Sequence, residues 1–198
     1  MLRVLLALTA VFLVYKLMPS SREINAPRPS PGVRVSSDPV QRDVGNGVVW
    51  TFGKYQITPL ASYDIDGVVL STEPYRLGRE SELSPIDFAV AWGSMSDQAI
   101  IDQIHFAQGN RFLRFSEPRL ALSADEMNSH VANMHLIPAT PEIASQFKTA
   151  VHGQIVTMSG YLVRVDAQDG FHWVSSMSRT DRGAGACELM WVERFSLR

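Results

Sequence analysis

Cysteine is almost absent from the 198-residue chain, which contains only Cys187. A single cysteine excludes an intramolecular disulfide, so the fold has to rest on its hydrophobic core. A lipid-modified amino terminus is excluded too, because no cysteine follows the first apolar run. An excess of charge is also lacking, since 18 basic and 20 acidic side chains give a formal net charge of -2. We therefore expect no nucleic-acid partner, which would require a basic face.

Long apolar runs are lacking except in residues 1–18, where a short uncharged stretch lies between Arg3 and Lys16. Its length suits a secretory signal peptide and also a short membrane span, if the flanking basic side chains reach the lipid headgroups. Small residues that would mark a cleavage site are missing, and the first usable alanine, Ala26, is followed by Pro27. We therefore expect residues 1–18 to form a transmembrane signal anchor that is retained.

The flanking charges give two opposite orientations for this anchor. Counted literally, the basic residues after the run, among them Lys16, Arg22 and Arg28, would place the domain inside. An apolar run at the extreme amino terminus with a basic head is instead the usual form of an export signal. We adopt the second interpretation and predict a single-pass protein of the inner (cytoplasmic) membrane, with its globular domain on the periplasmic, extracytoplasmic side.

Residues 19–47 lack hydrophobic periodicity and are rich in proline and serine. Such a segment buries too little apolar surface to offset its ordering entropy, so we predict a tether that holds the domain away from the membrane. The alternatives are a strap lying on the domain and a proline-rich ligand for a partner. The remaining residues, 48–198, contain no internal repeat and suffice for one globular domain but not for two.

The domain is expected to be α+β and antiparallel, rich in strands, with short central helices. Apolar alternation predicts strands at 48–52, 55–58, 63–70 and 111–115, with turns or bulges at 53–54 and 66–67. Helix-start signals lie at Ser84, Ser94, Ser123 and Thr140. The first predicts a helix to Trp92, and the second predicts one that buries Ile100, Ile101, Ile104 and His105.

The last fifty residues are expected to form a small barrel-like sheet. Residues 154–165 predict a long strand, in which Gly160 marks a bend or the close approach of another backbone. A turn at 167–170 leads into 171–176 as a hairpin, and 187–195 predict the terminal strand. A helix followed by a long, glycine-bent strand and two returning strands is analogous to small barrels of the oligonucleotide/oligosaccharide-binding (OB) type. Such folds carry many functions, so this OB-like sheet predicts architecture only.

Two histidines, His130 and His135, flank Asn133 and could be catalytic, with Asn133 as a ligand-binding side chain. A metal pair on a helix requires a spacing of three or four residues, whereas these histidines are five apart. We therefore favour hydrogen-bonded structural histidines and expect no metal site.

The segment 175–188 concentrates hydroxyl groups, glycines and charges. Ser176, Arg179 and Arg182 are candidate ligand-binding residues, because glycine-rich backbone beside an arginine can hold an anion. Asp181 is a candidate catalytic residue. The segment matches no phosphate-binding loop, and no cofactor is expected. A long turn with an ion pair between Arg179 and Asp181 would explain the pattern without a ligand.

Cys187 and Glu188 follow this loop, and His172 on the preceding strand could lie across from them. A cysteine with a histidine nearby is the arrangement of a nucleophilic thiol, so these three residues are also candidates for catalysis. The alternative is that Cys187 is a small buried hydrophobic side chain at the start of a strand.

Residues 83–87 through 92–97, 133–139, and 173–181 running into 185–188 resemble segments of bacterial proteins with an amino-terminal membrane segment and no assigned activity. The resemblance implies a bacterial, membrane-anchored setting and no particular chemistry. The leading hypothesis is a membrane-anchored binding or scaffolding domain of the cell envelope, with the membrane and an envelope protein as partners. A membrane-anchored hydrolase or other enzyme is the alternative, and would require the histidines and the loop to converge in one cleft. A structural subunit of an envelope assembly would instead show an exposed apolar patch.

Overall fold

A computed structural model describes residues 29–45, 47–116, 122–181, 183 and 185–198. The described residues form a single domain rich in strands, with few and short helices. None of the helices in these ranges is long and apolar enough to cross a membrane. The predicted anchor, residues 1–18, lies outside the described residues.

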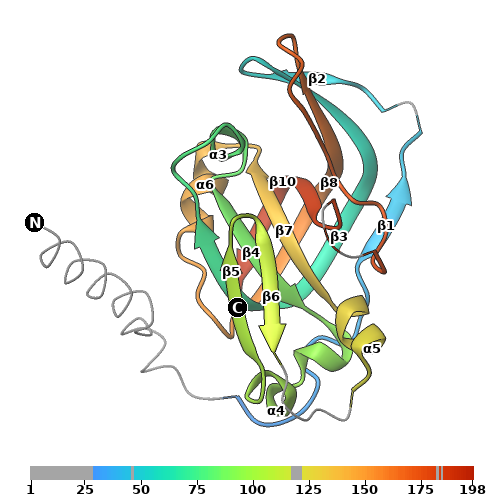
Figure 1. The fold of residues 1–198 in the computed structure, drawn as a ribbon, viewed down its shortest axis with the longest axis vertical. Helices are drawn as coiled ribbons and strands as arrows, with labels where there is room; N and C mark the ends of the chain where they lie inside the picture. Colours follow the sequence, from blue (N-terminus) through green and yellow to red (C-terminus); the bar gives the residue numbers. More distant parts are fainter. Residues whose placement is uncertain (1–28, 46, 117–121, 182, 184) are drawn as a thin grey trace, which may run out of the picture.

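Five strands pair in a closed ring, which forms the body of the molecule (Figure 1). In ring order they are β3 (Tyr55–Pro74), β4 (Ile86–Ala91), β7 (Val131–Pro138), β10 (Glu188–Leu197) and β8 (Ile155–Ala167), which pairs back onto β3. The pairing of β7 with β10 is parallel, and the other four are antiparallel. The sheet is therefore mixed rather than antiparallel throughout, and its ring draws strands from the whole domain rather than from the last fifty residues.

Five shorter strands flank this ring. Two of them, β1 (Val40–Asp43) and β2 (Trp50–Phe52), pair with β3, and β9 (His172–Val174) pairs with β8. The other two, β5 (His105–Gly109) and β6 (Phe112–Ser116), pair only with each other. This hairpin lies across β4 and β7 (Figure 1).

The helices are α3 (Glu80–Leu83), the 3-10 helix η1 (Gly93–Ser96), α4 (Gln98–Ile101), α5 (Ala124–Ser129) and α6 (Pro141–Phe147). Two predicted caps are confirmed, because the side chains of Ser123 and Thr140 accept hydrogen bonds from the backbone N–H groups of Glu126 and Ile143. The helix expected after Ser94 is instead capped by Asp97 and ends at Ile101.

The helix predicted from Ser84 to Trp92 is wrong, because this segment forms strand β4. All six of its residues, Ile86–Ala91, are buried between β3 and β7. Burial on both faces favours a continuous apolar strand, and this tertiary environment outweighs the local capping pattern. The hydroxyl of Ser84 accordingly contacts the Ile86 carbonyl oxygen and the Asp87 carboxyl group instead of capping a helix.

The predicted strands 55–58 and 63–70 are parts of one long strand, β3. The turn at Gly53–Lys54 is confirmed, since it joins β2 to β3. The turn or bulge expected at Asp66–Gly67 is absent, because both residues pair with β8 in unbroken register within β3. Gly67 is required there by close packing, since a Cβ atom would lie 2.2 Å from a methyl carbon of Val90.

The strands predicted near the carboxyl end are confirmed as β8, β9 and β10. Gly160 is the point of close approach that its position in the strand predicted. A Cβ atom on it would lie 1.9 Å from the carbonyl oxygen of Trp191 on β10. The missing side chain therefore allows β8 and β10 to pair closely.

The described part of the proline-rich segment packs against the strand ring and the 3-10 helix η1. Val35 is buried in the core, and its N–H donates a hydrogen bond to Ser96 Oγ. The N–H of Gly32 donates to the Asp97 carboxylate, and β1 then pairs with β3. These residues behave as the strap alternative, because backbone hydrogen bonds and one buried valine compensate for the lack of a periodic apolar face.

Candidate functional site

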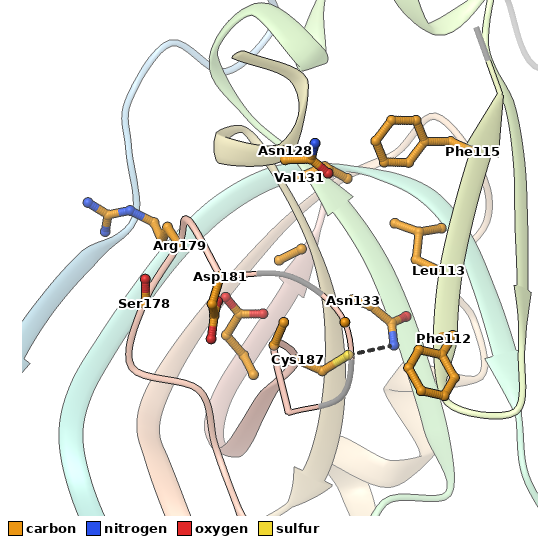
Figure 2. A pocket seen from close by; sticks show the side chains of 14 residues that line it. Phe112, Leu113, Phe115, Asn128, Val131, Asn133, Ser178, Arg179, Asp181 and Cys187 are labelled. Carbon is orange, nitrogen blue, oxygen red and sulfur yellow. Dashed lines mark hydrogen bonds between the residues drawn. The ribbon is translucent and has the colours of Figure 1, made fainter. Parts of the chain in front are cut away.

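A pocket of about 220 Å³ opens between strand β6, the start of β7 and the loop that precedes β10 (Figure 2). One side is apolar, formed by Phe112, Leu113, Phe115, Val131 and Ala132. The other side and the floor are polar, formed chiefly by Asn128, Asn133, Ser178, Asp181, Cys187 and Glu188. We call this cavity the hairpin–loop pocket.

Asn133 joins the hairpin to the strand beneath it. Its Nδ2 atom donates to the carbonyl oxygen of Arg111 at 3.0 Å and to Cys187 Sγ at 3.5 Å. Its Oδ1 atom accepts from Gln108 Nε2 at 2.7 Å, and Gln108 in turn accepts from Ser71 Oγ at 2.6 Å. This chain of hydrogen bonds fixes the apolar wall of the pocket over β7.

Arg111 anchors the tip of the same hairpin. Asn110 and Arg111 form its two-residue turn with φ values of 52° and 65°, a conformation that costs energy for an arginine. The guanidinium donates to the Asp87 carboxylate and to the Ser84 carbonyl oxygen, and it lies 3.8 Å from the centre of the Tyr75 ring. Because the Asp87 side chain is only 1% exposed, this ion pair is largely buried.

The candidate histidines lie in three separate places. His135 is buried, with its Nδ1 atom 3.0 Å from Asp87 Oδ1 and its ring packed on Trp173. His130 lies at the end of α5, where Nδ1 is 2.8 Å from the Glu126 carbonyl oxygen. His172 is half exposed on β9 and contacts Asp166. None of the three lines the hairpin–loop pocket.

The loop before β10 keeps its two described charges apart. Ser176 Oγ donates to Asp181 Oδ2 at 2.6 Å, which holds Asp181 at the pocket. Arg179 donates instead to the carbonyl oxygen of Pro39, and its guanidinium points away from the pocket (Figure 2). Arg182, the third candidate of this loop, lies outside the described residues.

Cys187 lines the pocket with a thiol that is partly buried. Burial raises the pKa of this thiol, and the hydrogen bond from Asn133 opposes the shift only in part. The group is therefore a thiol near neutral pH, whereas nucleophilic catalysis requires the thiolate. His172, its proposed partner, is engaged with Asp166.

Glu188 forms part of the lining as a buried acid. It is 5% exposed, and its Oε2 atom has no hydrogen-bond partner within the described structure. Burial raises the pKa of this carboxyl group to about 8, an effect that the charge of Asp181 increases and that a backbone N–H and Arg179 oppose. Glu188 is therefore protonated and neutral at pH 7.

The pocket thus brings together Asn133, Asp181, Cys187 and Glu188, four of the residues singled out from the sequence. Ser176 holds Asp181 by a hydrogen bond, and Arg179 contributes to the lining although its charge points elsewhere. The apolar wall, with Phe112, Leu113 and Phe115, was not predicted as part of a site. The signal for it was Asn110 between two strand-like segments, because asparagine tolerates the positive φ of a hairpin turn.

In the described ranges, no group of three or more histidine, cysteine or acidic side chains could hold a metal ion. No protein-family model matches the chain, and no curated protein and no solved structure is significantly similar to it. Function must therefore be argued from the pocket itself.

Proposed function

We propose that this protein is a binding domain of the cell envelope, held at the inner membrane by residues 1–18, with the hairpin–loop pocket as its ligand site. The observation that carries the proposal is the pocket's two-sided lining. An apolar wall faces hydrogen-bonding groups and a buried acid, the combination by which proteins bind and orient small organic molecules. At about 220 Å³ the pocket suits a small molecule rather than a polymer.

The strand order supports a binding role. We propose that the ring β3-β4-β7-β10-β8, in which β7 and β10 are parallel and helix α6 connects β7 to β8, is a barrel of the OB type. Barrels of this type serve many binding functions, so this likeness adds architecture and no ligand. The outer face of β4 and β7 is occupied by the chain's own hairpin, and the pocket beside that hairpin is an accessible concavity next to it.

The enzymatic alternative requires a base and a nucleophile in one cleft, and the described residues do not bring such a pair together. A hydrolase would need a base within hydrogen-bond reach of a nucleophile. His135 is enclosed by Asp87 and Trp173, and His130 and His172 are engaged elsewhere. The pocket therefore has a protonated thiol and a protonated acid but no histidine beside them, which favours binding over catalysis.

The test uses Cys187, the only cysteine in the chain, as a reporter inside the pocket. The purified full-length protein is treated with iodoacetamide, and the alkylation rate is followed by intact mass. Three probes of the same shape are added in turn: 2-phenylethanol, phenylacetate and 2-phenylethylammonium. Molecules of this size bind with affinities of about a millimolar, so titration extends to about 10 mM. We expect at least one probe to slow alkylation in a saturable manner.

Ala186→Phe provides the blocked pocket, because Ala186 lines the cavity and a phenyl group would fill it. Val48→Phe is the matched control, since Val48 is 83% exposed and does not line the pocket. Protection should be lost in the first variant and retained in the second. If no probe protects Cys187, or if the blocked variant is protected equally well, the pocket is not the ligand site.

A further inference from the structure

We infer that the ligand of the hairpin–loop pocket is a small organic cation, with an ammonium group bound at Glu188 and Asp181 and an apolar body against the hairpin. The inference rests on the proposed binding function and names the chemistry of the same site. Its first support is the distribution of charge. The charged or titratable residues of the described lining are Arg179, Asp181, Cys187 and Glu188, and the only cation among them points away toward Pro39.

The second support is the unsatisfied acid at the floor. Glu188 is 5% exposed, and its Oε2 atom has neither solvent nor a hydrogen-bond partner in the described structure. An unpaired buried carboxyl group lowers the stability of the fold, so its presence in a pocket lining calls for an explanation such as a bound ligand. A positively charged hydrogen-bond donor would supply the missing partner of Oε2. Its charge would also stabilise the ionised carboxylate of Glu188. A carboxylate ligand would instead face the negative charge of Asp181.

The third support is the apolar wall. The rings of Phe112 and Phe115 and the side chain of Leu113 come from one strand and line the side opposite Asp181 (Figure 2). Aromatic faces attract cations and also bury hydrocarbon. Taking about 30 Å³ for a water molecule, the volume admits roughly seven to ten non-hydrogen atoms. The ligand is therefore an amine on a short aromatic or aliphatic body.

Binding of such a cation releases a proton. The empty site holds Glu188 as a neutral acid, whereas the ammonium complex requires its carboxylate, so the carboxyl proton passes to solvent as the ligand enters. The other charged or titratable groups that interact with Glu188 are Asp181, Arg179, Tyr63 and Cys187. Affinity for the ammonium probe should therefore rise with pH up to about 8, while affinity for a neutral probe stays constant.

The three probes are similar in shape and differ in charge, so they test the inferred cation specificity in the Cys187 protection experiment. We expect 2-phenylethylammonium to bind at least tenfold more tightly than 2-phenylethanol at pH 8, and phenylacetate to bind more weakly than either. Glu188→Gln should remove the tenfold preference for the ammonium probe over 2-phenylethanol, together with its pH dependence. A cooperative urea unfolding transition, followed by tryptophan fluorescence, shows that the variant is folded.

The outcomes separate the inference from the proposed function. If 2-phenylethanol or phenylacetate binds as tightly as the ammonium, the pocket binds ligands but the cation is wrong. If no probe binds, the proposed function fails and the inference falls with it. A fourth probe, Nα-acetyl-lysine N-methylamide, tests the source of the cation. Binding as tight as that of 2-phenylethylammonium would indicate a protein side chain and overturn the small-molecule ligand.

Discussion

At the scale of single residues, the arginine at the hairpin tip stabilises the fold. Arg111 has a φ of 65°, which an arginine adopts only when its surroundings hold it there. They do so through a buried ion pair with Asp87 and a contact with the ring of Tyr75. Removing the guanidinium would leave the buried Asp87 carboxylate without its arginine partner, with only the Ser84 hydroxyl and His135 Nδ1 beside it. Such a loss costs more than the intact pair contributes.

We predict that Arg111→Gly lowers the free energy of unfolding by about 3 kcal/mol. Glycine adopts the same backbone conformation without strain, so the loss reports the guanidinium rather than the turn. Urea unfolding of the full-length protein, followed by tryptophan fluorescence, measures it. Adding Asp87→Asn should recover about 1 kcal/mol or more, because no uncompensated carboxylate remains. If the double variant instead loses the sum of the unfolding free energies lost by the two single variants, this role of the ion pair is contradicted.

We further predict that stability depends on pH through Glu188. In the unfolded chain a glutamate ionises above about pH 4.3. In the folded protein Glu188 retains its proton until about pH 8. The folded state thus binds more protons between these values, and its stability falls as pH rises through this window. Glu188→Gln should match the wild-type protein near about pH 4 and exceed its unfolding free energy by at least about 2 kcal/mol near about pH 8.5. Parallel pH profiles of urea unfolding would refute the assignment.

At the scale of elements, signals that act within a few residues were predictable from the sequence. The caps at Ser123 and Thr140 and the turn at Gly53–Lys54 are decided by the local backbone. Gly160 within a strand likewise signalled the close approach of another backbone, although not that Trp191 would supply it. The capping pattern at Ser84 failed because the chain's neighbours in the sheet decide the state of Ile86–Ala91. The local sequence does not indicate which strands will be the neighbours of β4 in the sheet.

The candidate site likewise has one part that the sequence predicted and one part that it did not. Asn133, Asp181, Cys187 and Glu188 were identified because polar and reactive residues cluster in two segments of the sequence, 129–135 and 175–188. The wall of Phe112, Leu113 and Phe115 comes from an inserted hairpin, and an alternating apolar pattern there predicts a strand without saying what it covers. The ion pair between Asp87 and Arg111 joins residues 24 positions apart, which spacing alone does not reveal.

The junction of β8 and β10 offers a prediction at this scale. Gly160→Ala should lower the free energy of unfolding by about 3 kcal/mol or prevent folding, because the new Cβ atom would overlap the Trp191 carbonyl oxygen. Gly109→Ala is the matched control, since nothing lies within 4 Å of its Cβ position. It should change stability by less than about 1 kcal/mol. Thermal unfolding of both variants measures the difference, and equal melting temperatures would show that the strands can separate without loss.

At the scale of the whole molecule, ring closure explains how the domain holds together without disulfides. Closing β8 onto β3 leaves none of the five ring strands as a free edge, and the ring encloses buried side chains such as Phe88, Met134 and Met158. The single cysteine lies at the pocket and not in a cross-link. The fold is therefore compatible with an oxidising or a reducing compartment, and the compartment has to be decided by experiment.

We predict that the carboxyl terminus lies outside the cytoplasmic membrane. Residues 1–18 have the basic head and apolar run of an export signal, although basic residues on the far flank favour the opposite orientation. Alkaline phosphatase fused after Arg198 should be active and a green fluorescent protein fused there should be dark, since the first requires an oxidising compartment and the second fails to fold when exported unfolded. Inverting Arg3 to Glu should shift a fraction of the molecules to the reverse orientation. The opposite pattern of reporter activities would place the pocket in the cytoplasm, where its organic cation would have to be a soluble metabolite and the envelope setting would be wrong.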